Sequence, residues 1–267
     1  MLDLKNKKII ITGGLGLLGI SLVEKLAKDG AELIILDLKS TNFLKKIKDY
    51  NFIKNNLNYF KCDVSEKKQL LKVKKKIFNK FNRVDVLINA AALNDAIENK
   101  TKIKSSRFEN YSLNDWNRSI KANLTSIFLC CQIFGVKMAK QKKGSIINIA
   151  STYGIVAPDQ KIYLNKNSKQ IFYKNPSYST TKSGVISLTR YLASYWGEVG
   201  VRVNSISPGG IQNKQNKNFI KKYSSKTLLK RMAMPHEIYG AVKLLCTEDS
   251  SYMTGSNIIV DGGWTAI

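Results

Sequence analysis

The sequence KIIITGGLGLLG, from Lys8 to Gly19, decides the fold. Its first half is a continuous, mostly β-branched run that is typical of a parallel strand buried on both faces. The glycine pattern Gly14-x-Gly16-x-x-Gly19 follows, and an amphipathic helix pattern then continues to about Asp29. Glycines between a strand and a helix let the backbone approach a pyrophosphate, which then faces the positive end of the helix. The stretch therefore predicts a dinucleotide-binding strand–turn–helix unit.

Asp37 supports the same interpretation, because it ends a second strand pattern over residues 32–37. A dinucleotide fold places a carboxylate at about this distance from the glycine turn, on the adenosine ribose diol. A carboxylate there repels a 2′-phosphate, so Asp37 favours NAD over NADP. The nearby Lys39 weakens that preference, since a lysine can accept a phosphate, and the alternative for Asp37 is a turn residue at a strand end.

Strand and helix patterns alternate along the whole chain, without a linker or a repeat. We therefore expect one α/β domain over 1–267, a doubly wound Rossmann fold with about seven parallel strands and right-handed crossovers. Two less regular segments are expected beside the active site: an insertion or lid at about 152–175 and a substrate loop at about 211–230.

Several small or polar residues follow the expected strands, where open α/β sheets bind their ligands. Asp63 is placed either to accept from an adenine amino group or to begin a helix. Asn89 and the alanines after it follow the buried run 84–88, and small side chains there let a ligand lie against the backbone. Ser151 follows the strand pattern 144–149.

Tyr178 and Lys182 lie four residues apart, just after Pro176 and at the start of a run with helical periodicity. They are expected one turn apart on the same helix face. An ammonium group and a helix N-terminus both favour the phenolate, which would tune the tyrosine for proton exchange with a carbonyl or hydroxyl. The alternative is the beginning of a surface helix.

Two further features of the helices bear on the site and on assembly. Asn123 is a polar residue on an otherwise apolar helix face, so it needs a buried partner. The stripe Val185, Leu188, Leu192 and Trp196 serves either the core or an interface between subunits, and the two alternatives stay open.

Composition excludes several classes of protein. The formal net charge is +25, but the excess is scattered lysine without arginine clusters or interleaved aromatics, so we expect no nucleic-acid partner. One histidine, His236, cannot build a zinc centre or a catalytic triad, and it is expected to begin a helix. The cysteines lack metal-type spacing and are expected to be small buried side chains of a cytoplasmic protein without a metal: Cys62, Cys130, Cys131 and Cys246.

The sequence also gives no sign of a membrane or secretory segment. No run of about eighteen apolar residues is present, so no membrane span is expected. Residues 1–8 lead directly into a strand and have no apolar leader with a cleavage site.

Taken together, these residues resemble the short-chain dehydrogenase/reductase family, and the matches run from Thr12 to Trp264 in family order. TGGLGLLG is similar to its cofactor loop, and NAAA at Asn89 is similar to its NNAG element. Pro208-Gly209 resembles the turn that covers the nicotinamide, and a late R…P-x-E signature is matched by Arg231, Pro235 and Glu237. The family's catalytic tetrad is matched by Asn123, Ser151, Tyr178 and Lys182.

The chain departs from the family pattern in four places, one of which is NAAA at Asn89 in place of NNAG. Leu17 stands where the second glycine of the usual loop is expected, and Asn213 replaces a threonine that often follows the Pro-Gly turn. Ser151 and Tyr178 are 27 positions apart, roughly twice the usual interval, and the extra residues fall in the 152–175 insertion. Substrates of common members therefore transfer poorly to this chain.

The resemblance implies hydride transfer between a nicotinamide and an alcohol or ketone. Tyr178 is expected to be the acid/base group, and Ser151 to stabilise the substrate oxygen. Lys182 is expected to bind the nicotinamide ribose and lower the Tyr178 pKa, and Asn123 to hold a water. Cofactor binding is expected at Gly13, Gly14, Leu15, Gly16, Leu17, Leu18, Gly19, Asp37, Leu38, Asp63, Val64, Asn89, Ala90, Ala91, Tyr178, Lys182, Pro208, Gly209 and Ile211.

A finer similarity is to bacterial members from surface-glycan and nonulosonate sugar biosynthesis loci. It is carried by TGGLGLLG, by the segment 157–160 in the insertion and by LTRYLASYW over 188–196. It implies a polar sugar derivative as substrate. The resemblance to the family as a whole implies a homodimer or homotetramer as the assembly. The alternatives are a 3-oxoacyl-[acyl-carrier-protein] reductase and, from another class, a catalytically silent NAD-binding module.

Overall fold

The computed structural model describes residues 4–39, 42, 47, 50–94 and 103–267. Within them, seven parallel strands form one sheet in the order β3-β2-β1-β4-β5-β6-β7. The order reverses beside β1, as in a doubly wound sheet, and this confirms the expected Rossmann-type α/β fold. The strands are β1 (Lys8–Thr12), β2 (Glu32–Asp37), β3 (Leu57–Lys61), β4 (Val86–Asn89), β5 (Gly144–Ile149), β6 (Val201–Pro208) and β7 (Asn257–Val260).

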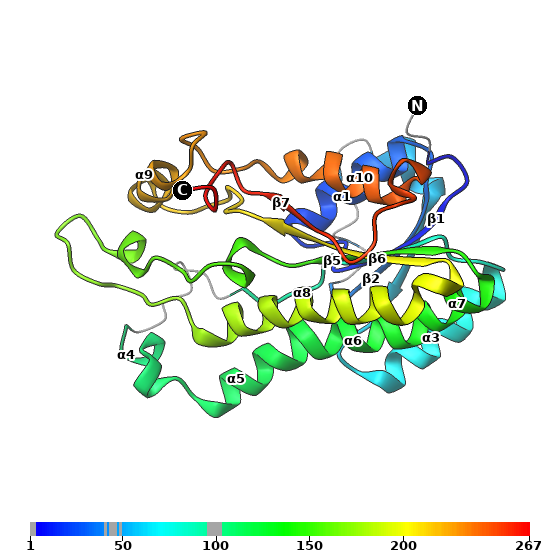
Figure 1. Ribbon diagram of the computed structural model, residues 1–267, viewed down its shortest axis with the longest axis horizontal. Coiled ribbons are helices and arrows are strands. Elements are labelled where there is room, and N and C mark those ends of the chain that lie inside the picture. Colours follow the sequence, from blue (N-terminus) through cyan, green and yellow to red (C-terminus); the bar gives the residue numbers. More distant parts are fainter. Residues whose placement is uncertain (1–3, 40–41, 43–46, 48–49, 95–102) are drawn as a thin grey trace.

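Helices cover both faces of the sheet (Figure 1). Helices α3, α6, α7 and α8 lie on one face, and α1 and α10 lie on the other. The helices are α1 (Leu17–Lys28), α2 (Tyr50–Ile53), α3 (Lys67–Lys80), α4 (Ile103–Ser106), α5 (Leu113–Ile120), α6 (Ser126–Cys130), α7 (Val136–Gln141), α8 (Pro176–Trp196), α9 (Lys217–Lys226) and α10 (Tyr239–Cys246).

The sequence of strand β1 is apolar without alternation because both faces of the strand are buried. Ile10 packs into the core shared with α3, α6 and α8, whereas Ile9 and Ile11 pack into the core shared with α1 and α10. All three side chains are 0% exposed. Burying each of them contributes roughly 2 kcal/mol, so the run that begins the glycine loop is anchored from both sides.

Helices α5, α6 and α7 form one continuous helical segment, interrupted by two wider π-type turns at Lys121–Thr125 and Cys131–Gly135. By length and composition alone this segment, Leu113–Gln141, could cross a membrane, which differs from the expectation based on uninterrupted apolar runs. A hydropathy window tolerates scattered polar residues, and 56% of this window is buried in the fold, as in the core helix of a sheet protein.

The apolar stripe of helix α8 serves the core of the protein. Val185, Leu192 and Trp196 are buried in the core on the α8 face of the sheet, and Leu188 packs against the same core. Two aromatic side chains that α8 leaves exposed, Tyr191 and Tyr195, lie outside this stripe, and their rings stack with centroids 6.0 Å apart.

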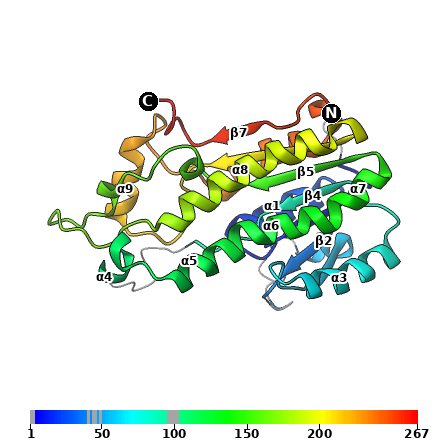
Figure 2. The ribbon, with the colours of Figure 1, turned by 60° about the horizontal axis from the view of Figure 1, so that its bottom comes forward.

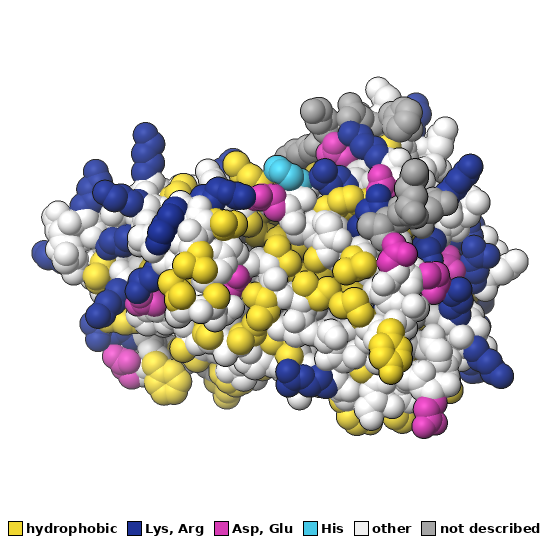
Figure 3. Space-filling model, turned by 45° about the horizontal axis from the view of Figure 1, so that its top comes forward, with side chains coloured by type: hydrophobic (Ala, Val, Ile, Leu, Met, Phe, Trp, Pro, Cys, Tyr) yellow, Lys and Arg dark blue, Asp and Glu magenta, His cyan; other side chains and the backbone are white. Residues whose placement is uncertain are grey.

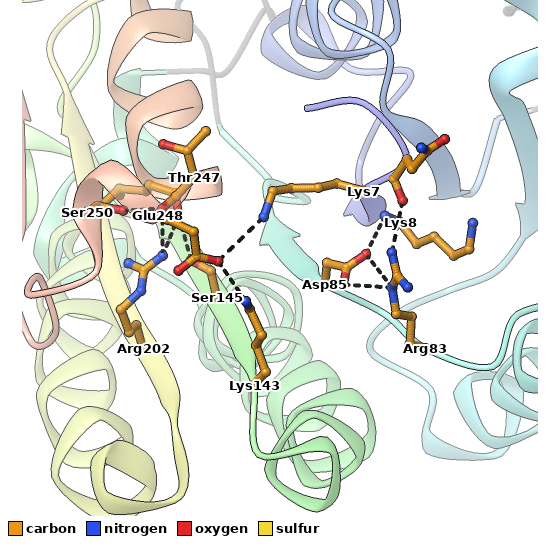
Figure 4. Close-up of polar contacts among 12 residues, drawn as sticks. Lys7, Lys8, Arg83, Asp85, Lys143, Ser145, Arg202, Thr247, Glu248 and Ser250 are labelled. Atoms are coloured by element: carbon orange, nitrogen blue, oxygen red, sulfur yellow. Dashed lines mark hydrogen bonds and ion pairs between the residues drawn. The ribbon is translucent and has the colours of Figure 1, made fainter. Parts of the chain in front are cut away.

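The amino-terminal edge of the sheet carries ion pairs (Figure 4). Glu248 contacts Lys143 at 3.0 Å and Lys7 at 3.8 Å, and Arg202 donates to backbone carbonyls at the end of α10. Such partly exposed pairs contribute about 0–1 kcal/mol each. They close the end of the sheet opposite to the one where ligands bind in this class of fold.

The segment after β5 is more ordered than a free loop. It forms 3-10 turns at Thr152–Gly154 and Gln160–Tyr163, and it lies beside α9 (Figure 2). Helix α9 itself occupies part of the stretch expected as the 211–230 substrate loop. Together with late residues these segments form an aromatic cluster of Tyr153, Ile162, Tyr163, Phe172, Tyr223, Met232 and Trp264.

Candidate active site

Two adjoining cavities lie at the carboxyl ends of the strands, and Ala90 and Ala92 line both of them. The dinucleotide cavity, about 450 Å³, runs along the glycine loop and the ends of β2 and β3. The substrate cavity, about 410 Å³, holds Ser151, Tyr178 and Lys182 and reaches to the end of β6 and to α9.

The glycine loop rests directly on the segment after β4. A Cβ on Gly13, which has φ +66°, would lie 2.6 Å from the Cα of Ala91, and a Cβ on Gly19 would lie 2.1 Å from the Gly13 carbonyl oxygen. Thr12 Oγ1 accepts from the backbone N–H groups of Ala90 and Ala91, each at 3.1 Å. These contacts leave room only for glycine and hold the backbone where a pyrophosphate can approach it.

Asp37 braces this loop and also lines the dinucleotide cavity. Its carboxylate accepts from the backbone N–H of Leu15 at 2.8 Å and of Lys39 at 2.9 Å. Lys39 Nζ in turn donates to the Leu15 carbonyl at 2.6 Å. The wall therefore presents an acid and a base side by side, with Leu38 between them.

Asp63 has a local role in addition to its place on the same wall. Its Oδ1 accepts from the backbone N–H and the hydroxyl of Ser65, at 2.9 and 2.7 Å. Asp63 thus shapes the turn before α3 and borders the cavity with Val64, and its expected contact with an adenine amino group stays a prediction.

Helix α8 positions the tyrosine and the lysine. Asn175 caps its N-terminus by accepting from the Tyr178 N–H at 3.2 Å, and Pro176 occupies the first turn, where its missing N–H costs nothing. One turn later Lys182 is buried, with its Nζ 2.8 Å from the Ile149 carbonyl oxygen and 5.8 Å from the centre of the Tyr178 ring.

Ser151 reaches the same point from the end of β5. Although 27 positions separate it from Tyr178 in sequence, the two side chains share a hydrogen bond. The insertion therefore leaves the sheet and returns to it without separating the two residues.

The electrostatics differ from the sequence expectation of a tyrosine with a lowered pKa. Burial raises the pKa of Tyr178, and the hydrogen bond with Ser151 only partly opposes this. Burial also lowers the pKa of Lys182 to about 8. Loss of hydration is the largest effect on both groups, because each is packed under the insertion and the end of β5.

Asn123 lies in the first π-type turn, is fully buried and has the hydrogen-bond partner that its position required. Its Oδ1 accepts from the Leu93 N–H at 2.6 Å, and its Nδ2 donates to the Leu93 carbonyl at 3.0 Å. The side chain thus ties the segment after β4 to the long helix, and its expected role in holding a water stays a prediction.

The predicted cofactor residues divide into two groups. Gly14, Leu15, Gly19 and Asn89 lie behind the cavity walls, and the remaining predicted residues line one of the two cavities. Asn89 is 1% exposed and donates to the Asn148 side chain on β5 at 2.8 Å, so it joins two strands instead of facing a ligand.

Sequence reasoning missed several residues of the substrate cavity. Lys174 is 8% exposed, and its Nζ lies 4.1 Å from the centre of the Tyr178 ring. A lysine two positions before a helix gives no sequence signal of burial. The other missed residues come from three segments: Asn94, Tyr163, Gln215, Phe219, Tyr223 and Met232.

Of the histidine and the four cysteines, Cys62 alone lines one of the two cavities. Throughout the described part of the chain, no three His, Cys, Asp or Glu side chains gather as metal ligands. All four cysteines are buried free thiols, as expected. His236 is exposed in the 3-10 turn Pro235–Ile238 before α10 and is visible in cyan in Figure 3.

A doubly wound sheet with a glycine loop, an acid at the end of β2 and a Ser–Tyr–Lys group defines a dinucleotide-dependent dehydrogenase. A family model described as "Enoyl-(Acyl carrier protein) reductase" matches residues 17–265. The chain belongs to the short-chain dehydrogenase/reductase family.

Three relatives illustrate the family's range. A short-chain dehydrogenase from Leptospira borgpetersenii serovar Hardjo-bovis, solved with bound NAD+, is 32% identical with a TM-score of 0.86, and the match covers 98% of this chain and 94% of that one. The 3-oxoacyl-[acyl-carrier-protein] reductase FabG of Thermotoga maritima is 28% identical, over 97% of this chain and 98% of its own. Post-translational flagellin modification protein A of Campylobacter coli is 27% identical, over 98% and 99%.

Proposed function

We propose that this NAD(P)-dependent oxidoreductase interconverts an alcohol and a ketone on a polar sugar derivative, in the synthesis of a surface glycan. The observation that carries the proposal is the chemistry of the substrate cavity. Amide and ammonium groups of Asn94, Lys174, Asn213 and Gln215 line it together with several tyrosines. Such groups suit a polyhydroxylated substrate better than an acyl chain, and the flagellin-modifying relative supports a role at a cell-surface protein.

The glycine loop fits a nicotinamide dinucleotide, since any side chain at Gly13 or Gly19 would clash with backbone. The cofactor, when bound, supplies or accepts the hydride. Asp37, Leu38 and Asp63 would hold its adenosine half, and Lys182 its nicotinamide ribose. We propose NAD as the preferred cofactor, because Asp37 places negative charge beside the ribose position, although Lys39 shares that wall.

Side chains of the protein carry out the proton transfer. Tyr178 protonates the alkoxide that forms during reduction, or removes the alcohol proton during oxidation. Ser151 donates to the same oxygen and stabilises its developing charge. Lys182 carries positive charge behind the tyrosine, and its lowered pKa lets it exchange a proton near neutral pH.

Two alternatives remain. A 3-oxoacyl-[acyl-carrier-protein] reductase is favoured by the Thermotoga maritima relative and by the aromatic cluster, which offers apolar surface. A catalytically silent NAD-binding module is favoured by no particular contact, and the intact Ser151, Tyr178 and Lys182 argue against it.

Turnover assays separate the three functions. The purified protein is given NADH or NADPH with free and nucleotide-linked keto-sugars, and in parallel with an acetoacetyl thioester. Consumption of NADH with a keto-sugar is expected. Reduction of the thioester with NADPH would instead select the acyl reductase. Binding of a cofactor without any turnover across the panel would select the silent module.

A further inference from the structure

We propose that the insertion 152–175 and the segment 211–230, which includes α9, together form a basic lid that docks on an anionic lipid surface. The contact is peripheral, is made by exposed side chains and involves no membrane span. The inference goes beyond the proposed function, because it concerns the outer surface of these two segments and holds whichever substrate the cavity accepts.

The charge of the basic lid is one-sided. Its two segments contain ten lysines, no arginine and a single acid, Asp159, whereas the whole chain has 19 acidic residues. That acid already pairs with Lys226 of α9 at 2.9 Å. Along the sequence the excess lysine looks scattered, but the fold brings two distant segments together and concentrates their charge.

Contacts between the insertion and α9 make the basic lid one unit. Lys222 Nζ and Asn218 Nδ2 both donate to the Leu164 carbonyl, at 2.8 and 2.9 Å. The Tyr163 ring stacks on Phe219 with centroids 5.6 Å apart. The lysines of both segments therefore lie at one end of the molecule, the left end in Figure 1, and Figure 3 shows lysine and arginine side chains gathered there.

Six of these lysines are available to a partner. On α9, Phe219 and Tyr223 turn toward the aromatic cluster, which leaves Lys217 and Lys221, one turn apart, on the outer side of the helix. All six are exposed, and none belongs to an ion pair within the described residues: Lys161, Lys166, Lys169, Lys214, Lys217 and Lys221.

Exposed aliphatic side chains accompany the lysines. Ile155 and Ile171 of the insertion are 41% and 37% exposed, and Leu228 and Leu229 after α9 are 51% and 63% exposed. A surface that combines lysines with such side chains suits an anionic bilayer, because the ammonium groups meet the head groups while the aliphatic groups enter the interface.

The same composition disfavours other polyanionic partners. Protein interfaces are enriched in arginine and aromatic residues and depleted in lysine, and single-stranded nucleic acids stack on exposed aromatic rings. The structure describes every residue of the basic lid, and none of its aromatic side chains is exposed. The first arginine after it, Arg231, is already paired with Glu237 at 2.6 Å. An anionic lipid surface is therefore the partner that fits.

Vesicle sedimentation tests the contact without a substrate. The whole chain is mixed with vesicles of phosphatidylcholine alone, or of phosphatidylcholine and phosphatidylglycerol in equal parts. We expect binding to the anionic vesicles to be at least about tenfold tighter and to weaken as salt is raised, because exposed charges are screened. Equal binding to both kinds of vesicle, or no binding to either, would overturn the proposal.

Matched double variants locate the contact. Lys217→Gln with Lys221→Gln should weaken binding to the anionic vesicles by about tenfold or more, since each lysine near such a surface contributes roughly fivefold. Lys72→Gln with Lys76→Gln is the control, because these lysines are also exposed and one turn apart, but lie on α3, toward the opposite end of the molecule in Figure 1. Thermal unfolding of each variant shows whether the fold is retained.

A second double variant, Lys166→Gln with Lys169→Gln, tests the insertion and should weaken binding by a similar factor. The proposal fails if folded lid variants bind the anionic vesicles as tightly as the control does. It also fails if soluble poly-L-glutamate binds more tightly than these vesicles, since an acidic protein would then be the partner. Failure of every keto-sugar in the turnover assays would leave the vesicle result intact, so the two proposals fail separately.

Discussion

At the scale of single residues, burial and neighbouring charges have opposite effects on the pKa of Tyr178. Two ammonium groups lie on the tyrosine ring, from Lys174 at 4.1 Å and Lys182 at 5.8 Å, yet burial raises the Tyr178 pKa. The tyrosine therefore holds its proton in the folded protein and is suited to donate it during ketone reduction.

Replacing Tyr178 by Phe removes that proton and leaves the ring packing in place. We expect kcat/KM to fall by about a hundredfold or more, with NADH binding unchanged, because general acid–base catalysis supplies at least this factor. Steady-state rates and a fluorescence titration of NADH measure the two effects. Tyr191→Phe, on the exposed side of the same helix, is the control. A near-native rate for Tyr178→Phe would contradict the assigned role.

Lys182 gives the stability of the protein a defined pH dependence. Burial lowers its pKa from the ordinary 10.5 to about 8. Between these values Lys182 is protonated in the unfolded chain and neutral in the folded protein. The contribution of Lys182 to the free energy of unfolding therefore rises with pH from about 8 to 10.5, and it is smallest below pH 8. The full effect is about 3 kcal/mol, by the conversion of the shift from 10.5 to about 8 into free energy.

Urea unfolding at a series of pH values, from about 7 to about 10, tests this expectation. Wild-type protein should gain free energy of unfolding relative to Lys182→Met as pH rises. The raised pKa of Tyr178 acts in the opposite sense only above the ordinary tyrosine range, so the window excludes it. Parallel curves for the two proteins would show that Lys182 is not held at a lowered pKa.

At the scale of elements, the start of α8 joins stability to catalysis. Asn175→Ala removes the cap from the Tyr178 N–H, and Ser112→Ala removes the equivalent cap of α5, where Ser112 accepts from the Asp115 N–H at 3.0 Å. Each change is expected to cost about 1 kcal/mol of stability. Only Asn175→Ala should also lower kcat, by roughly tenfold, because small displacements of a reacting group are costly.

Thermal or denaturant unfolding and steady-state rates measure both consequences. Asn175→Asp, which can still cap the helix, should restore the rate. If Ser112→Ala lowered kcat as much as Asn175→Ala, the loss would reflect stability alone and the coupling between cap and catalysis would be refuted.

The elements also show which patterns a sequence reveals. The buried strands and α8 were predictable, because apolar periodicity and a proline at a helix start are local signals. Helix α9 was expected as a polar loop, since Lys217–Lys226 is dominated by polar residues and only its contacts with the insertion give its apolar side a partner. Lys174 was missed for a related reason, because burial of a lysine is decided by segments distant in sequence.

At the scale of the whole molecule, the sheet and the gathering of the tetrad residues at its carboxyl edge followed from strand order and the glycine loop. The sequence did not predict which of the expected cofactor residues line the cavities and which lie behind the cavity walls. Asn89 faces Asn148 because β4 and β5 pair with these two residues in register, which the sequence alone does not specify. The formal net charge is +25, and Figure 3 shows lysine and arginine side chains at both ends of one face, with apolar side chains between them.

The exposed aromatics of α8 predict how whole molecules associate. We propose a homodimer or homotetramer in which Tyr191 and Tyr195, 63% and 67% exposed, contact a second copy together with Phe128 on the neighbouring helical segment. Changing both tyrosines to Glu should convert the assembly to monomers in sedimentation velocity. Tyr252→Glu, fully exposed in the turn before β7, should not. A wild-type protein that sediments as a monomer would refute the proposal.

The aromatic cluster has a consequence for biosynthesis. Trp264 stacks on Tyr223 with ring centroids 4.4 Å apart, and Tyr153, which packs edge-on against Tyr178, touches the same tryptophan. Strands β1 to β4, which surround the glycine loop, lie within residues 8–89, but the wall over Tyr178 needs Trp264, far along the chain. A ribosome-bound chain can therefore assemble the dinucleotide half early, whereas the pocket that selects the substrate closes only after Trp264 has left the exit tunnel.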